Sequence, residues 1–494
     1  MKLPRISQKV VVGVVYVCAL FMAIMDVTIV NVALPVIGRD FHTSPAAVDS
    51  VSISFLVSTG VFIAASGWLG DKFGGRKVLL SAIVLFTVAS ALCGIASSLG
   101  ELVVFRALQG MGGGLMTPVG MAMLFRVFPP AERVRASSIL IIPTAFAPAL
   151  GPVLGGLLVT DVNWRWVFFV NVPIGAIAVV FGLIFLHDHV QPEPGRFDLA
   201  GFLLAAGGLG LAMYGISEGP LQGWGTMAVL STISVGAVLL IALVLVELRI
   251  DEPLVDLRLY SNRLFRSSSI VMVLGSVGFL GVLFIVALFY QDGLHLSALQ
   301  SGLSTFPEAL GVMLGAQISS RLLYPLYGPR RLMSGGLLIV ASSMCLLAQV
   351  GATTSLWWAR FFMFILGLGI SQVFIPAQAA SFATITTQKT GRASTLFNSA
   401  RQLGGAVGVA VLTTVVATVG ATRTVATGAV VPNLASYHAA FYCAAAIAVL
   451  GTLAALRIHD EDAAGTMVRR GRLARKDEGE GLPAEPPTPV IAEA

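Results

Sequence analysis

The sequence contains few charged residues and few cysteines. Only 11% of its 494 residues are charged, whereas soluble proteins average about 25%. All four cysteines (Cys18, Cys93, Cys345 and Cys443) lie within apolar segments, so the sequence predicts neither a disulfide framework nor a metal site. The phosphate-binding pattern G-x-x-x-x-G-K-[ST] is also absent, so we do not expect a protein powered by nucleotide hydrolysis. We expect no cofactor.

Apolar residues are abundant instead. They make up 56% of the chain, and the mean hydropathy is +0.87. The first apolar run is too long for a cleavable signal peptide and has no small-residue cleavage site. A membrane-spanning helix needs about 20 mainly apolar residues. We expect fourteen, near 11–35, 47–69, 78–98, 101–125, 136–159, 165–186, 198–218, 227–247, 268–290, 299–321, 332–350, 356–380, 394–418 and 437–456. The sequence predicts an all-α polytopic membrane protein.

The basic residues lie mainly in alternate loops. With the N-terminus placed in the cytoplasm, most of the 31 lysines and arginines fall on that side, and only Arg39, Arg165 and Arg423 fall outside. Cytoplasmic loops carry an excess of Lys and Arg. The pattern therefore predicts a protein of the cytoplasmic membrane with both termini inside.

A lone acid, Asp26, lies inside the first apolar segment. A carboxylate in bilayer hydrocarbon costs roughly 2.5 to 3.5 kcal/mol, so it is retained where it is paired, protonated or facing water. Arg106 in the fourth segment lies at a comparable depth. Pairing with Asp26 would let Arg106 influence the protonation of the acid. The alternative is that Arg106 extends to the outer interface.

A charged loop, Gly67-Trp68-Leu69-Gly70-Asp71-Lys72-Phe73-Gly74-Gly75-Arg76-Lys77, joins the second and third segments. Its glycines permit a tight turn, and Asp71 lies among three cations, where it can pair or cap a helix. Composition alone would favour an ordinary charged loop. The spacing resembles the signature G-x-L-a-D-r-x-G-r-k of the major facilitator superfamily, with Gly75 where a base is usual. This resemblance implies a gating loop that uses Gly67, Asp71, Gly74, Arg76 and Lys77.

The fifth segment contains a run of small residues and prolines. Small residues allow helices to approach closely, so generic packing is one explanation. The spacing also resembles the antiporter motif of exporters in the same superfamily, with Ala147 where a glycine often stands. That resemblance implies export and assigns the motif to Pro148, Gly151, Pro152, Gly155 and Gly156.

Two further segments, Asp26–Pro35 and 163–175, complete the resemblance to the fourteen-span drug:proton antiporter family. The resemblance implies the major facilitator fold, with two six-helix bundles around a midplane cavity and two helices inserted between them. We expect an N-terminal bundle over 1–190, inserted helices over 191–262 and a C-terminal bundle over 263–457. Residues 458–494 have too few apolar residues to fold, so we expect them to form a disordered cytoplasmic tail.

Glu308 is a second acid within an apolar segment, directly after Pro307. It could bind a cationic substrate, carry a second coupled proton, or pack as a protonated group. Arg401 could pair with Glu308 or bind an anionic substrate group. Asn31, near Asp26, is another substrate or coupling candidate.

The sequence as a whole predicts a proton-coupled secondary transporter that exports lipophilic or cationic drugs or antibiotics by alternating access. Asp26 would bind and release the coupled proton. Arg106 and Glu308 are also expected to take part in proton coupling. The expected partners are a small molecule, protons and the bilayer, with no nucleic acid, and the protein would be a monomer. The alternatives are a dedicated exporter of one endogenous metabolite or lipid, and a non-transporting sensor or assembly protein. The sequence shows no nucleophile–base pair or metal-binding cluster, so we do not expect an enzyme.

Overall fold

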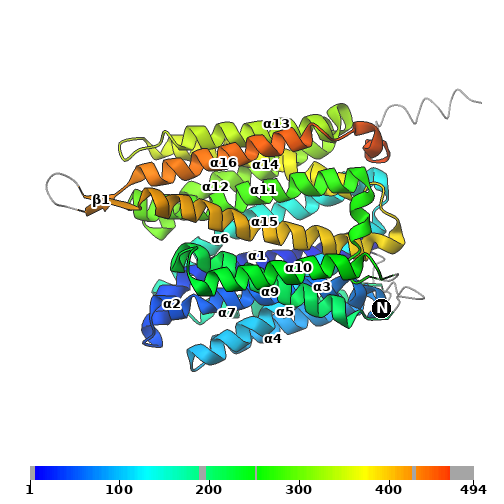
Figure 1. Ribbon diagram of the computed structural model, residues 1–494, viewed down its shortest axis with the longest axis horizontal. Helices are drawn as coiled ribbons and strands as arrows, with labels where there is room; N and C mark the ends of the chain where they lie inside the picture. The colour runs from blue at the N-terminus through cyan, green and yellow to red at the C-terminus, as the bar shows by residue number, and fades with distance from the viewer. Residues whose placement is uncertain (1–5, 188–195, 251–252, 425–429, 468–494) are drawn as a thin grey trace, which may run out of the picture.

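The computed structural model describes residues 6–187, 196–250, 253–424 and 430–467, and these residues are almost entirely helical. Apolar segments form helices because a chain in lipid must satisfy its backbone hydrogen bonds within the segment. The helices run roughly parallel to one another along the long axis of the molecule (Figure 1).

The first half of the chain forms one bundle. Its long helices are α1 (Gln8–Asp40), α3 (Ser50–Phe73), α4 (Gly75–Ile95), α5 (Leu99–Val127), α6 (Arg133–Asp161) and α8 (Asn171–Phe185). Short elements connect them: α2 (Pro45–Val48), η1 (Pro130–Glu132) and α7 (Trp166–Phe169). Helix α5 packs on α1, α3 and α4, and α1 also packs on α6 and α8. Helices α1 and α5, which carry Asp26 and Arg106, are therefore neighbours.

The second half forms a matching bundle, seen in the upper part of Figure 1. Its long helices are α11 (Arg263–Leu288), α12 (Ala298–Ile318), α13 (Tyr324–Leu347), α14 (Leu356–Ser381), α15 (Thr390–Val419) and α16 (Leu434–Ala455). The short helical elements are η2 (Leu257–Ser261), η3 (Phe289–Gly293), η4 (Ser319–Leu323) and η5 (Thr387–Lys389). Strands β1 (Thr422–Thr424) and β2 (Val430–Pro432) pair antiparallel between α15 and α16, with Arg423 opposite Val431.

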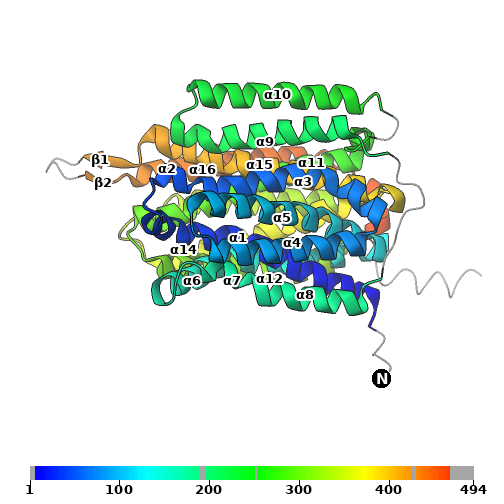
Figure 2. The same ribbon diagram turned by 90° about the horizontal axis from the view of Figure 1, so that it is seen from below.

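Two helices lie outside both bundles. Helix α9 (Leu199–Gln222) packs on α3 and α15, one helix from each half, and α10 (Met227–Glu247) packs on α9. Figure 2 shows α10 as the outermost helix, with α9 between it and the rest of the molecule. The pair therefore covers the side on which α3 meets α15.

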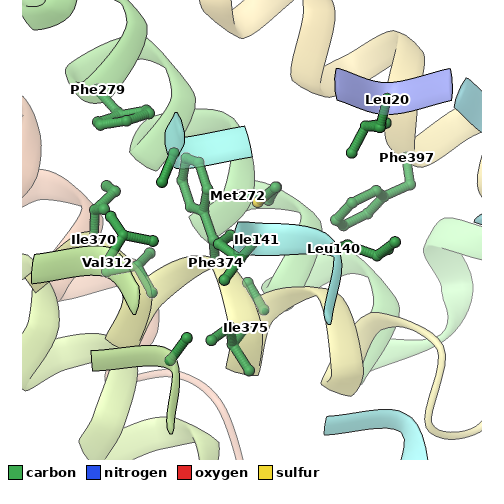
Figure 3. Close-up of a cluster of buried hydrophobic side chains, with 14 of the residues drawn as sticks. Leu20, Leu140, Ile141, Met272, Phe279, Val312, Ile370, Phe374, Ile375 and Phe397 are labelled. Atoms are coloured by element: carbon green, nitrogen blue, oxygen red, sulfur yellow. The ribbon is translucent and has the colours of Figure 1, made fainter. Parts of the chain in front are cut away.

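The two halves contact each other through α6 with α12 and α14, and through α3 and α5 with α15. Buried apolar side chains from both halves gather between them (Figure 3). The labelled residues are Leu20, Leu140, Ile141, Met272, Phe279, Val312, Ile370, Phe374, Ile375 and Phe397. Aliphatic and aromatic groups thus pack at the centre of the molecule, and some of them meet edge to face, such as Phe279 and Phe374.

Twelve helical stretches among the described residues are long and apolar enough to cross a membrane. One of them, Leu299–Leu347, contains both α12 and α13, and α5 is not among the twelve. The expected number of fourteen spans stays a prediction.

Both ends of the described chain lie at one end of the bundles, which we call the Lys9 end. Lys9, near the start of α1, forms an ion pair with Glu132 of η1 at 2.7 Å, and η1 contacts η6 (Asp460–Thr466), which follows α16. Figure 1 shows the N-terminus and the end of α16 on the same side.

The prediction of disorder is wrong for residues 458–467. Thr466 is buried and its hydroxyl bonds to that of Tyr324 at 2.7 Å. Asp462 forms an ion pair with Arg263 at 2.9 Å. Composition alone could not reveal these contacts, because they depend on helix ends far away in the sequence. Residues 468–494, the rest of the expected tail, lie outside the described residues.

Candidate functional site

Asp26 lies at the centre of a buried polar network. Its side chain is 0% exposed and that of Arg106 is 1% exposed. Arg106 Nη1 donates to Asp26 Oδ2, which forms an ion pair between α1 and α5. The alternative position for Arg106, at the outer interface, does not agree with this burial. The structure thus brings together the two charged residues that the sequence places at similar depth.

Two amides complete the network. Gln109 Nε2 donates to Asp26 Oδ1 at 2.7 Å, and Asn171 Nδ2 donates to the same oxygen at 3.1 Å. Asn171 also donates to Ser90 Oγ at 3.1 Å. Neither amide is among the site residues that the sequence predicts. Gln109 could have been found, because it lies three residues after Arg106 and so shares its helix face.

The rest of the surroundings of Arg106 hold its guanidinium in place. Its Nε donates to the carbonyl of Val51 at 3.2 Å, and its Cζ lies 4.2 Å from the centre of the Phe55 ring, a cation–π geometry. A buried ion pair is tolerable when its remaining polar atoms are also bonded. Both oxygens of the Asp26 carboxyl group accept hydrogen bonds in this arrangement.

The small residues of the fifth apolar segment allow α6 to approach α1 beside Asp26. A Cβ added at Gly151 would lie 2.0 Å from Thr28 Oγ1, and one at Gly155 would lie 3.2 Å from Ile29. Gly156 has open space instead, and Pro148 is half-buried. The side chain of the motif's other proline, at position 152, is outside the described residues.

At the Lys9 end, Asp71 of α3 forms an ion pair with Arg126 of α5 at 2.5 Å. We expected its partner among the adjacent cations of the loop, but this partner is 55 residues away. A Cβ added at Gly391, in the first turn of α15, would lie 2.9 Å from Asp71 Oδ1. The carboxylate therefore lies beside a helix N-terminus, where the backbone dipole favours negative charge.

The other residues of the loop have varied surroundings. A Cβ added at Gly67 would lie 2.7 Å from Thr395 Oγ1 of α15, so α3 and α15 touch here. Gly74 has φ of +92°, which favours glycine. Arg76 donates to the carbonyl of Leu183 at 2.7 Å, and Lys77 is exposed.

Further contacts hold the two halves together at this end. Arg133 Nη1 of α6 donates to the carbonyl of Phe382, which follows α14. The rings of Phe125 and Phe382 stack with centroids 4.6 Å apart. Ser394 Oγ of α15 donates to the carbonyl of Pro118 of α5 at 2.7 Å. The halves are therefore closed against each other at the Lys9 end.

The remaining candidates lie apart from the network. Glu308 is 0% exposed, and neither of its carboxyl oxygens has a hydrogen-bond partner within the described part of the chain. Arg401 is half-buried. Its pairing with Glu308 is not found in the described structure, because both carboxyl oxygens of Glu308 lack a partner there. Asn31 is exposed and accepts a hydrogen bond from Ser52 Oγ at 3.2 Å. The described residues contain no group of three or more His, Cys, Asp or Glu placed to hold a metal.

Comparison with protein families and known proteins gives consistent matches. The family described as Major Facilitator Superfamily matches residues 16–409. A multidrug resistance protein B homolog of Mycobacterium tuberculosis (strain ATCC 25618 / H37Rv) is 32% identical over 405 residues, 81% of this chain and 74% of the relative. The tetracenomycin C resistance and export protein of Streptomyces glaucescens is 33% identical over 392 residues, 79% of this chain and 73% of the relative.

Solved structures match at the level of the fold. The crystal structure of the human organic anion transporter MFSD10 (TETRAN) superposes with a TM-score of 0.64 over 91% of this chain and all of that one, at 15% identity. A proton:xylose symporter structure, XylE, gives a TM-score of 0.60 at 16% identity, covering 91% of this chain and 95% of that one.

Proposed function

Since the chain belongs to the Major Facilitator Superfamily, we propose that it is a proton-coupled exporter of lipophilic or cationic drugs or antibiotics. It is a multi-pass membrane protein and a transporter rather than an enzyme, with relatives named for multidrug and antibiotic resistance. The observation that carries the proposal is the buried ion pair of Asp26 and Arg106 within a hydrogen-bonded network. The acid is isolated from water in this arrangement, as a coupling site must be at some stage.

In the proposed cycle, Asp26 takes up a proton when its surroundings open to the outside and releases it toward the cytoplasm. Protonation removes the charge that holds Arg106, so the network loosens and α1 can shift against α5. Each charge that crosses 100 mV contributes about 2.3 kcal/mol. One coupled proton could therefore support roughly tenfold accumulation or more, at about 1.4 kcal/mol per decade.

Asp71 and its loop would latch the cytoplasmic gate. The ion pair of Asp71 with Arg126 and its position at the start of α15 support this role. Opening the Lys9 end would require α3 and α15 to separate, and would remove the carboxylate from the positive end of the α15 dipole. The closed contacts at this end correspond to an outward-facing or occluded stage of alternating access.

We propose fourteen membrane spans with both termini in the cytoplasm. Helix α5 has 29 residues, or about 43 Å at 1.5 Å per residue, enough to cross a bilayer. The π-helical turn η4 separates α12 from α13, and the backbone is non-helical at Gly328 near the start of α13, so this stretch counts as two spans. The two bundles, 1–190 and 263–457, would act as the rocking units, with the inserted helices of 191–262 at their side and the protein as a monomer.

Glu308 is a candidate second coupling group. A buried carboxyl without a hydrogen-bond partner is far less costly when protonated than when ionised. The residue could bind a cationic substrate instead, once the halves separate. Asn31 could contact substrate near the opening of the first bundle, because it is exposed five residues beyond Asp26.

The proposal is tested by fluorescent dye uptake into inverted membrane vesicles, with and without an imposed pH gradient. We expect dye to accumulate when the interior is acidic and to be released when the gradient is collapsed. Accumulation that is unaffected by the gradient would argue against proton coupling. An exporter of a single compound is the second candidate, because one relative is named for a single antibiotic, tetracenomycin C. Resistance of expressing cells to one compound only, out of a chemically varied set, would favour it.

A further inference from the structure

Arg401 is an intramembrane cation that the proposed coupling network does not use. It lies on α15, on the same helix face as Ser394 and Asn398, which are seven and three residues before it. Those two residues face α5 of the other half. Ser394 Oγ bonds to the carbonyl of Pro118 at 2.7 Å, and Asn398 Nδ2 lies 3.3 Å from Met121 Sδ. Arg401 therefore points toward the first half of the protein and away from lipid.

Tyr16 of α1 lies on the same side of this interface. Its hydroxyl donates to the carbonyl of Thr117 at 2.8 Å, the residue before Pro118, whose carbonyl accepts from Ser394. No ion pair within the described part of the chain includes Arg401. The side chain is partly exposed, and its helix face meets the first half of the protein without an acidic partner in the described structure.

The other two intramembrane arginines differ in this respect. Arg106 is almost fully buried and pairs with Asp26. Arg360 lies near the start of α14 and stacks over the ring of Trp357 at 4.7 Å. A charged group at membrane depth is costly and is usually functional, and it commonly faces a water-filled space or a counter-charge. Arg401 alone among the three has neither a carboxylate nor an aromatic face as its partner in the described structure.

The surroundings of Arg401 combine this charge with apolar surface. Phe397 lies one helical turn before it, toward the closed Lys9 end, and Figure 3 shows Phe397 close to Leu20 and Leu140 of the other half. A guanidinium presents a planar set of donors that matches the two oxygens of a carboxylate. Aliphatic and aromatic side chains beside it suit a lipophilic body.

We propose that Arg401 binds the acidic group of the exported compound, which would be a lipophilic molecule with a free carboxylate or an ionised phenol. This inference rests on the proposed export function, and it narrows the lipophilic or cationic substrates proposed above to those that also carry an acceptor anion, zwitterions included. Binding at Arg401 would then contact both halves at their interface, which is where alternating access requires a substrate to act.

The test measures equilibrium binding to the purified full-length protein in detergent, without any gradient. The probes are a carboxyl-rhodamine and its methyl ester, which differ only in whether the carboxylate is free. We expect the wild-type protein to bind the free acid more tightly than the ester. Arg401→Gln should weaken binding of the acid by about tenfold or more, as expected for a lost charge-assisted hydrogen bond, and should change binding of the ester by less than about threefold.

Arg360→Gln is the matched control, because it removes a membrane guanidinium away from the proposed contact, and it should leave both affinities near wild type. Arg401→Lys keeps the charge without the planar donors and should give an intermediate loss for the acid only. Equal weakening of both dyes by Arg401→Gln, or tighter binding of the ester than of the acid by the wild-type protein, would overturn the proposal. The wild-type comparison holds even if the variants do not fold. If the wild-type protein binds the acid more tightly than the ester but shows no gradient-driven transport, the proposed export mechanism is wrong and the proposed role of Arg401 in binding is not.

Discussion

Asp71 of the first half lies directly against Gly391 in the first turn of α15, which belongs to the second half. A Cβ at position 391 would lie 2.9 Å from Asp71 Oδ1 and 3.0 Å from Oδ2. The carboxylate is thus held at a helix N-terminus of the other bundle, while Arg126 of its own bundle pairs with it. This contact depends on both bundles, so it can report whether the Lys9 end is open or closed.

Gly391→Ala should weaken closure at this end. The added methyl group must displace the Asp71 carboxylate or push α15 away from α3, because the contact is closer than side-chain carbons normally allow. We expect dye efflux to fall by about tenfold, corresponding to roughly 1.4 kcal/mol of lost closed-state stability. Spin-label distances between α3 and α15 at the Lys9 end should shift toward longer values.

Gly335→Ala on α13 is a suitable control for that experiment, because nothing lies within 4 Å of its added Cβ. Efflux near wild type for both variants would show that the contact between Asp71 and Gly391 does not control closure.

Asp26→Asn should abolish proton-driven efflux while the protein is still expressed and folded. The amide is close to the carboxylate in size but cannot exchange a proton or pair with the guanidinium of Arg106. Gradient-driven dye uptake into vesicles is the measurement, with size-exclusion chromatography as the check on folding. Undiminished gradient-driven uptake in this variant would remove Asp26 from the mechanism.

Asn171→Leu should lower the stability of the protein and reduce gradient-driven efflux. Asn171 donates to Asp26 Oδ1 at 3.1 Å, so the variant leaves a buried carboxylate with one donor fewer. A lost hydrogen bond to a charged group costs about 1.5–3 kcal/mol. The melting temperature of the purified variant and its dye uptake into vesicles measure the effect.

Ser90→Ala provides the comparison for Asn171→Leu. Ser90 accepts from Asn171 but donates to the carbonyl of Phe168, and makes no described contact with Asp26. Its removal should lower the melting temperature and the dye uptake much less. Equal melting temperatures of wild type and Asn171→Leu would show that this amide does not stabilise the Asp26 carboxylate.

The sequence was sufficient for features that depend on local pattern or on depth in the membrane. The apolar runs located the helices, and equal depth suggested that Arg106 could reach Asp26. The sequence was insufficient where the partner lies on a different helix with no pattern to identify it. Asn171 is a single amide in an apolar segment, and Arg126, rather than a cation of the same loop, pairs with Asp71. Rotation of each helix about its axis decides such contacts, and apolar residues on every side leave that rotation undetermined.

Gly151→Ala should destabilise the packing of α6 on α1. The new methyl group would lie 2.0 Å from Thr28 Oγ1, two residues after Asp26. Overpacking of this kind typically costs about 1–3 kcal/mol, so we expect a lower melting temperature and reduced efflux. Combining it with Thr28→Ala removes the clashing hydroxyl and should restore part of both properties. A double variant that loses the sum of the single effects would indicate that the two residues do not interact in the folded protein.

Glu308→Gln should separate a role in substrate charge from a role in coupling. The amide has nearly the same shape as the protonated acid, and Glu308 has no described hydrogen-bond partner to lose, so we expect stability within about 1 kcal/mol of wild type. If the carboxylate binds cationic compounds when the halves separate, efflux of a cationic dye should fall by about tenfold, as for a lost charge contact. Efflux of a neutral dye of similar size should then change little. Equal loss of efflux for both dyes with normal stability would place Glu308 in proton coupling, because every substrate depends on that step. Equal loss with a lower melting temperature would assign Glu308 to packing between α12 and α14.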